Sequence, residues 1–167
     1  RMLEVVVEID GRPLSRWACD GVVCATPTGS TAYAYSAGGP IVWPEVEALL
    51  MVPISAHALF ARPMVVSPRS MLAVEFLGSS AGPSQPLEGV LWCDGRRSID
   101  LAPGARVEVR RGDKPVLLAR LRGGADGHGL AAPFTFTDRL VAKFGLPVTG
   151  GRGRKDRGAG RDGKGDP

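Results

Sequence analysis

Residues 3–19 read LEVVVEIDGRPLSRWAC, and the pattern of this stretch sets the class of fold. Its first part, residues 3–10, is predicted to be a strand, because it is rich in the β-branched residues that favour strands. Asp10 and Gly11 form a dipeptide that is typical of tight hairpin turns. A second strand is predicted over residues 14–19. The two strands and the turn between them predict an antiparallel hairpin.

Further along the chain, short strand-like runs recur between Gly- and Pro-containing turns. They are predicted at residues 21–25, 63–66, 71–76, 87–93, 106–111 and 116–121, with a turn at Asp94-Gly95. Short helices are predicted after Pro44 (residues 45–50) and over residues 134–144, and a Gly-rich loop over residues 123–131. The sequence therefore predicts a mostly β fold: an antiparallel, β-sandwich-like domain with a few short helices over residues 1–149.

Composition limits the function classes. Apolar residues make up 44% of the chain and charged residues 23%, which is typical of a globular domain. No apolar run approaches the roughly 20 residues that span a bilayer, so no membrane partner is expected. Three cysteines without metal-ligand spacing predict buried, reduced thiols and a cytoplasmic location. The chain begins directly with a strand and without Met, and we expect it to be part of a longer protein.

Most of the net charge of +4 lies in the tail. Residues 150–167 hold six bases and three acids, so the tail carries three of the four charges and residues 1–149 are nearly neutral. A Gly-rich, charge-mixed tail without apolar anchors predicts disorder. The folded part offers no basic surface for nucleic acid, and no such partner is expected.

The stretch that indicates function is DGVVCATPTGSTAYAYSAGGP, residues 20–40. Hydroxyl residues before a short Ala- and Tyr-containing run, closed by two glycines and a proline, predict a short capped helix. Free amides at its start suit an anionic ligand group, and Tyr33 offers a face on which a base stacks. The carboxylate of Asp20 can accept hydrogen bonds from an amide or hydroxyl group of a ligand. The hydroxyl groups available to a ligand belong to Thr28, Ser30, Thr31 and Ser36. The structural alternative is a strand–turn–helix joint in which hydroxyls cap the helix and Tyr33 fills the core.

Several motifs resemble one family. They are DGVVCATPTGSTAY (residues 20–33), SAGGPI (36–41), VPISAHALFARPMV (52–65), CDG (93–95) and the ending PF…FTDRL…KF (133–144). Together they resemble the C-terminal domain of NAD kinases and cover most of residues 1–149. The resemblance implies a dinucleotide site formed by Asp20, Thr28, Thr31, Ala32, Tyr33, Ala34, Tyr35 and Ser36. In some members the matching Asp reaches a neighbouring subunit's ligand, and the matching Tyr lies against a base.

NAD kinases share a second motif, Gly-Gly-Asp-Gly in an N-terminal domain, whose Asp is taken as the general base. Neither this motif nor the Asn-Glu pair that grips the ribose occurs in the sequence. The resemblance therefore implies an intact enzyme that phosphorylates NAD to NADP with ATP or polyphosphate and Mg²⁺, as a dimer or tetramer. This chain would supply the NAD site, with no catalytic or metal-binding residue, and be inactive alone.

Two further residues of these motifs and their surroundings, His57 and Arg96, are assigned no catalytic role. His57 lies among apolar residues and is expected to be a structural hydrogen-bonder. Arg96 stands where many members carry Gln, and an Arg there would favour a phosphate. Two other functions stay open: a C-terminal domain like that of the diacylglycerol or sphingosine kinases, and a β-rich interaction module without its own ligand.

Overall fold

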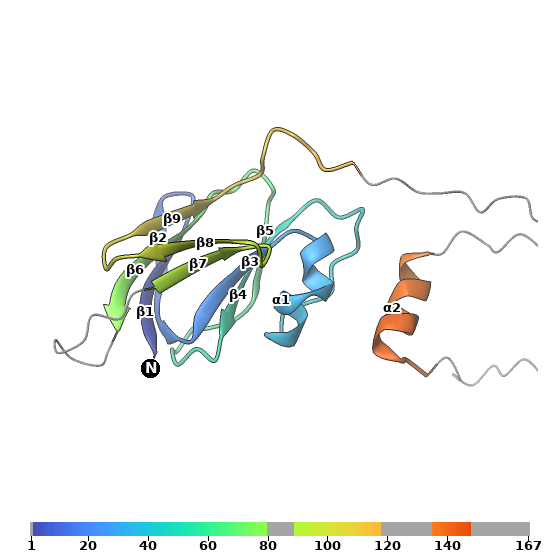
Figure 1. Cartoon of the computed structure of the whole chain (residues 1–167), viewed down its shortest axis with the longest axis horizontal. Coiled ribbons are helices and arrows are strands. Elements are labelled where there is room, and N and C mark those ends of the chain that lie inside the picture. The colour runs from blue at the N-terminus through green and yellow to red at the C-terminus, as the bar shows by residue number, and fades with distance from the viewer. Residues whose placement is uncertain (1, 80–88, 118–134, 148–167) are drawn as a thin grey trace, which may run out of the picture. The chain divides into compact units, whose positions relative to one another are not determined.

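The structure is a computed structural model that describes residues 2–79, 89–117 and 135–147 (Figure 1). The chain divides into two units, residues 1–118 and 119–167, each of which is described by itself. The predicted domain boundary at residue 149, the loop 123–131 and the tail 150–167 lie outside the described residues. The fold class is confirmed, because the described elements are mostly antiparallel strands with few helices.

The first sheet contains four antiparallel strands in the order β2-β1-β6-β9. They are β1 (Leu3–Ile9), β2 (Arg12–Cys19), β6 (Leu72–Ser79) and β9 (Arg106–Val109). The predicted hairpin pairs β1 with β2, Val5 lying opposite Trp17. Asp10 and Gly11 at its turn have φ angles of 52° and 75°. Positive φ at both central residues is the geometry of the twisted two-residue turn that the dipeptide predicts.

The second sheet contains three antiparallel strands in the order β3-β4-β5. They are β3 (Gly21–Ala25), β4 (Leu49–Ile54) and β5 (Met64–Val66). A separate hairpin joins β7 (Gly89–Cys93) to β8 (Arg97–Leu101) through the predicted turn at Asp94 and Gly95. The hairpin packs on β6, because Gly89 lies so close to the Phe76 ring that an added Cβ would be 3.2 Å from it.

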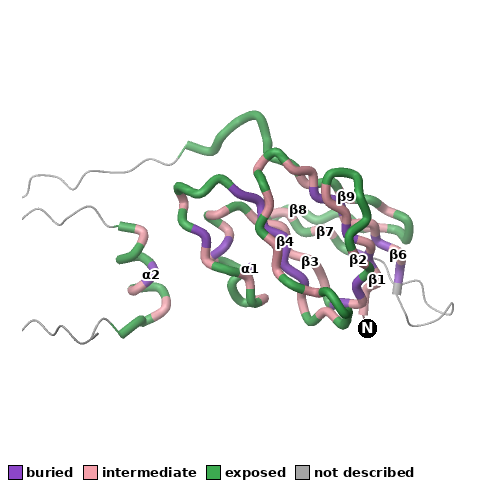
Figure 2. Tube along the Cα trace, turned by 180° about the vertical axis from the view of Figure 1, so that it is seen from behind, coloured by how far each residue is buried: buried purple, intermediate pink, exposed green. Residues whose placement is uncertain are grey.

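The two sheets share one hydrophobic core, as expected of a sandwich. From the first sheet it takes Val5, Val7, Trp17, Cys19, Leu72 and Phe76, and from β4 it takes Leu49 and Met51. The alternate residues of β4, Leu50 and Val52, are also fully buried. Side chains alternate between the two faces of a strand. Strand β4 is therefore covered on both faces from Leu49 to Pro53, and Figure 2 shows buried residues along it.

A short helical segment covers the outer face of the second sheet. It consists of a 3₁₀ turn, η1 (Thr28–Thr31), and one α-helical turn, α1 (Tyr33–Ser36), between β3 and β4 (Figure 1). Ala34 is buried, and a Cβ added to Gly39 would lie 2.7 Å from the Ala34 carbonyl oxygen and 2.9 Å from Val52. The turn at Gly39 thus packs closely between α1 and Val52 of β4.

The loop after β4 protects the free edge of β2. The amide of His57 donates to the Ala18 carbonyl at 2.8 Å, and the Trp17 indole Nε1 donates to the Phe60 carbonyl at 2.7 Å. An unpaired edge strand invites pairing with other chains, and a loop laid over it removes that opportunity.

Three predictions of secondary structure are corrected. Residues 45–50 are not a helix, because Leu49 and Leu50 pair with Val66 and Val65 as the start of β4. Strand β9 ends at Val109 rather than at residue 111. Val116 and Leu117 lie in no strand, and residues 118–121 of that prediction lie outside the described part. Strand β8 was not predicted, because its sequence RSIDL carries little apolar pattern.

The second unit contributes one described helix, α2 (Phe136–Phe144), close to the predicted range. Its N-terminus is a capping box, in which Thr135 Oγ1 accepts from the Asp138 amide and Asp138 accepts from the Thr135 amide. These reciprocal hydrogen bonds satisfy two amides that the helix leaves unpaired. Residues 133 and 134 of the resembling motif lie outside the described residues.

Candidate functional site

The helix predicted after Thr28 is present but differs in detail. It is divided into η1 and α1, whose N-cap positions are Pro27 and Ala32, and neither has a side-chain cap. The predicted hydroxyl capping is therefore wrong. Each piece has only four residues, too short for the aligned peptide dipoles that make a helix N-terminus attract anions. The C-terminal glycine is as predicted, since Gly38 has a φ of 82° and donates to the Tyr35 carbonyl at 2.9 Å.

Ser30 is the one predicted hydroxyl that no ligand can reach. Its side chain is fully buried. Its Oγ donates to the Pro27 carbonyl at 2.6 Å and accepts from the Val42 amide at 3.0 Å. The other hydroxyl residues are exposed or half-buried. Ser30 therefore has a structural role at the base of the segment and is removed from the ligand-contacting candidates.

The two tyrosines of the segment lie at the surface. Tyr33 is 62% exposed and Tyr35 is 42% exposed, whereas Ala34 between them is buried against the sheet. Thr28, Ala32 and Ser36 are exposed, and Thr31 is half-buried. The alternative in which Tyr33 fills the core is therefore wrong. Seven of the eight predicted site residues retain accessible surface, and the eighth, Ala34, is buried.

Asp20 does not lie with the other predicted residues. It immediately follows β2, and its amide donates to the Ile54 carbonyl at 2.9 Å. Strand β3 then runs from Gly21 to Ala25 before the helical segment begins. Four steps of about 3.3 Å place the two ends of this strand roughly 13 Å apart. The fold thus separates the exposed Asp20 from the Tyr-bearing segment within one chain.

Neither of the two surface pockets described in the first unit is lined by a predicted dinucleotide-binding residue. One, of about 280 Å³, is lined by Glu4, Arg16, Trp17, Ala18 and His57, and Arg16 donates to Glu4 within it. The side chain of His57 is exposed there, and the backbone amide of this residue makes its structural hydrogen bond. These contacts assign no catalytic role to His57.

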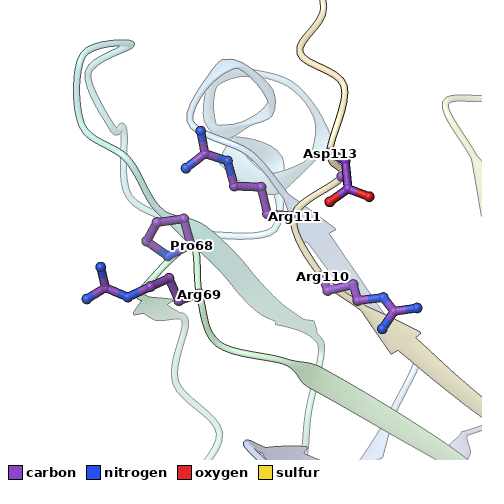
Figure 3. A pocket seen from close by; sticks show the side chains of 6 residues that line it. Pro68, Arg69, Arg110, Arg111 and Asp113 are labelled. Atoms are coloured by element: carbon purple, nitrogen blue, oxygen red, sulfur yellow. The ribbon is translucent and has the colours of Figure 1, made fainter.

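The other pocket, of about 430 Å³, lies between the residues before β6 and those after β9. It is lined by Pro68, Arg69, Arg110, Arg111, Gly112 and Asp113. Figure 3 shows Arg110 pointing away from Arg69 and Arg111. Arg111 is 3.4 Å from the carboxylate of Glu47. The cationic groups do not converge on one point, as a bound phosphate would require.

Burial disfavours the thiolate form of two of the three cysteines, Cys19 and Cys24. All three cysteines are unpaired; Cys19 is buried, while Cys24 and Cys93 are half-buried. Burial raises the pKa of Cys24 to about 11, so its thiol is uncharged at neutral pH. Burial also raises the pKa of Cys19. Among the described residues no cluster of three or more His, Cys, Asp or Glu could hold a metal ion.

Arg96 is exposed in the β7–β8 turn, and its amide donates to the Cys93 carbonyl at 3.2 Å, a turn contact that gives its side chain no role. Among the described helices none has the length and apolarity needed to cross a membrane.

The architecture defines a class: a β-sandwich in which a short helical segment, rich in hydroxyls and tyrosines, covers one sheet and faces outward. The profile of the ATP-NAD kinase C-terminal domain matches residues 1–121. Because the match spans more than half of the sequence, the chain belongs to the ATP-NAD kinase family. Membership of this family decides against the lipid-kinase alternative.

Curated relatives are similar over nearly the whole chain. NAD kinase 2 of Streptomyces avermitilis is 67% identical over 153 residues, which cover 92% of this chain and 46% of the relative. NAD kinase of Thermobifida fusca is 65% identical over 154 residues, covering 92% of this chain and 42% of the relative. The chain therefore spans less than half the length of these relatives.

Solved structures agree with this placement. A crystal structure of an NAD kinase from Archaeoglobus fulgidus in complex with ATP is 30% identical with a TM-score of 0.57, over 68% of this chain and 41% of that one. A crystal structure of yeast NADH kinase complexed with NADH is 40% identical with a TM-score of 0.59. That match covers 65% of this chain and 30% of the yeast chain.

Proposed function

We propose that this chain is the NAD-binding part of an NAD kinase, which transfers a phosphoryl group to the 2′-hydroxyl of the adenosine ribose of NAD and forms NADP. The observation that carries the proposal is the exposed segment from Thr28 to Ser36 in a member of this family. Its Tyr side chains lie at the surface, while Ala34 between them is buried. Named relatives at 65–67% identity are NAD kinases.

In this proposal the segment binds and orients the dinucleotide. The Tyr33 ring stacks on a base, and the hydroxyls of Thr28, Thr31 and Ser36 form hydrogen bonds with ligand groups. Ala32, Ala34 and Tyr35 complete the surface around them. Such a surface covers only one side of a ligand, whereas small-molecule sites bury most of their ligand's area. We therefore infer that residues outside this chain close the site.

Asp20 has a separate place in the proposal. Because β3 separates it from the Tyr-bearing segment, Asp20 serves the dinucleotide bound to a neighbouring subunit, where its carboxylate accepts a hydrogen bond. This assignment requires a homo-oligomer, a dimer or tetramer. The exposure of Asp20 at the end of β2 leaves it accessible to a second copy.

The reaction itself needs groups that we place outside this chain. A general base removes the proton of the 2′-hydroxyl as its oxygen attacks the terminal phosphorus of ATP or polyphosphate, and ADP or the shortened polyphosphate leaves with the electrons of the broken P–O bond. Mg²⁺ supplies charge neutralisation at the transferred phosphoryl group when bound. The described residues contain no fitting cluster for this ion, so we assign none of them to it.

The cellular setting is also proposed. Three unpaired cysteines agree with a reducing, cytoplasmic compartment. The net charge of +4 lies mainly in residues 150–167, and we propose neither nucleic-acid nor membrane partners.

The test is a titration of the chain with NAD, monitored by NMR so that weak binding is measurable. Tyr33→Ala is expected to weaken binding by roughly 1–3 kcal/mol, the range of base–aromatic stacking. Trp92→Ala is the matched control, because Trp92 is 66% exposed on β7, outside the proposed site. Equal affinities for NAD in all three proteins, or no binding by any of them, would contradict the proposal.

A further inference from the structure

Ser30 links the two ends of the Tyr-bearing segment. Its hydroxyl donates to the carbonyl of Pro27, which precedes η1, and accepts from the amide of Val42, which follows α1. One buried side chain therefore joins backbone groups from the two sides of the segment. Val42 is itself buried.

The rest of the segment is held by hydrogen bonds of its own backbone and of the turn that follows it. The Gly39 amide donates to the Ala34 carbonyl at 2.8 Å, and Ala34 is buried. The Ala32 amide donates to the Gly29 carbonyl at 3.0 Å. These contacts shape each half of the segment, while the Ser30 hydroxyl joins its beginning to its end.

We propose that Ser30 is a positioning residue of the dinucleotide site, which holds Thr31 and Tyr33 in their binding geometry without touching the ligand. This role rests on the proposed function. Ser30 precedes Thr31 directly, and its side chain is fully buried below the exposed residues. A site that is already ordered before binding does not lose affinity to the entropy of ordering. Loss of the hydroxyl frees the Pro27–Val42 closure and lets the Tyr33 ring move from its stacking position.

The experiment compares NAD affinity in variants of the full 167-residue chain by NMR titration. Ser30→Ala removes the hydroxyl and leaves the Val42 amide without its acceptor. Because small misplacements of binding groups have large effects, we expect its dissociation constant for NAD to rise by about tenfold or more. Ser30→Cys, which keeps a weak donor of similar size, is expected to give a smaller rise.

A stability control separates positioning from folding. Val7→Ala removes buried apolar volume from the first sheet, away from the segment, and lowers the melting temperature. Its folded form is expected to bind NAD as the wild type does. Titrations are made well below the melting temperature of every variant, and Ser30→Cys carries the test if Ser30→Ala does not fold.

The outcomes distinguish this proposal from the proposed function. Wild-type affinity in the Ser30 variants overturns the positioning role alone, as does a loss of affinity that Val7→Ala shares. Absence of NAD binding by the wild-type chain at millimolar NAD contradicts the proposed function, and the role of Ser30 falls with it.

Discussion

At the scale of single residues, neighbours in the Tyr-bearing segment have opposite environments. Ala34 is buried on the sheet, whereas Tyr33 is mostly exposed. A larger side chain at position 34 would overpack a buried site, while a smaller one at position 33 leaves the fold intact. In this segment the small side chain occupies the buried position, and the large side chain lies on the exposed side, where the ligand is proposed to bind.

Gly39 gives a residue-scale prediction about packing. Gly39→Ala places a methyl group 2.7 Å from the Ala34 carbonyl oxygen and 2.9 Å from Val52. We expect a loss of about 1–3 kcal/mol in the free energy of unfolding, because a close-packed site has no room for the added carbon. Urea denaturation measures this loss.

Gly112→Ala is the matched control, since an added Cβ there meets nothing within 4 Å. Its stability is expected to equal that of the wild type within about 0.5 kcal/mol. Equal stabilities of the two variants would show that the segment moves away from β4 at no cost.

At the scale of elements, one arginine links β9 to β1 across the sheet. Arg106 donates to Glu8 at 2.8 Å and also to Glu108 on its own strand at 3.1 Å. Strand β6 lies between β9 and β1. The hydrogen bond from Arg106 holds the pKa of Glu8 below its usual range, so the charged form of Glu8 is favoured in the folded state.

This pair predicts a pH dependence. A carboxyl whose pKa is lowered by folding stabilises the fold above its unfolded pKa, and this contribution is lost as the pH falls through the folded value. The wild type should therefore lose stability on acidification below about pH 4.5, and Arg106→Gln should lose less. Melting temperatures from pH 7 to pH 3 measure the difference. Arg111→Gln, which removes an exposed ion pair, should lose as much stability on acidification as the wild type. If the melting temperature of Arg106→Gln falls with pH as steeply as that of the wild type, the pair of Arg106 and Glu8 is not the source of the pH dependence.

The capping box of α2 predicts the behaviour of that helix. Thr135→Ala removes the two hydrogen bonds that the Thr135 hydroxyl forms with Asp138 and is expected to destabilise the helix by about 1 kcal/mol. The measurement is the set of Cα chemical shifts of residues 136–144. Thr137→Ala, at an exposed position inside the helix, should leave these shifts helical; similar shifts in both variants would argue that tertiary contacts alone order α2.

At the scale of the whole molecule, the chain spans less than half the length of its curated relatives. We predict that it forms no NADP from NAD, ATP and Mg²⁺, since the general base and the metal ligands are expected elsewhere. The same chain joined behind the N-terminal half of the Streptomyces avermitilis relative should form NADP. The measurement is NADP formation in an enzyme-coupled assay. Robust NADP production by the 167 residues alone would contradict the division of labour proposed here.

Local signals explain which parts of the fold were predictable. Asp10-Gly11 and Asp94-Gly95 adopt positive φ angles because of their own residue types, and Thr135 with Asp138 forms a cap from four consecutive residues. Residues 45–50 misled the prediction because Leu49 and Leu50 enter a strand only through pairing with Val66 and Val65. That pairing partner lies too far along the chain for a local pattern to reveal.

Residue patterns alone were enough to establish the antiparallel class, the hairpin turns, the position of the Tyr-bearing turn and, through its motifs, the family. The exposure of Tyr33, the burial of Ser30 and the separation of Asp20 from the segment by β3 emerged only from the folded chain. The two kinds of feature differ because turn geometry depends on adjacent residues, whereas burial depends on which distant strand lies against a given side chain.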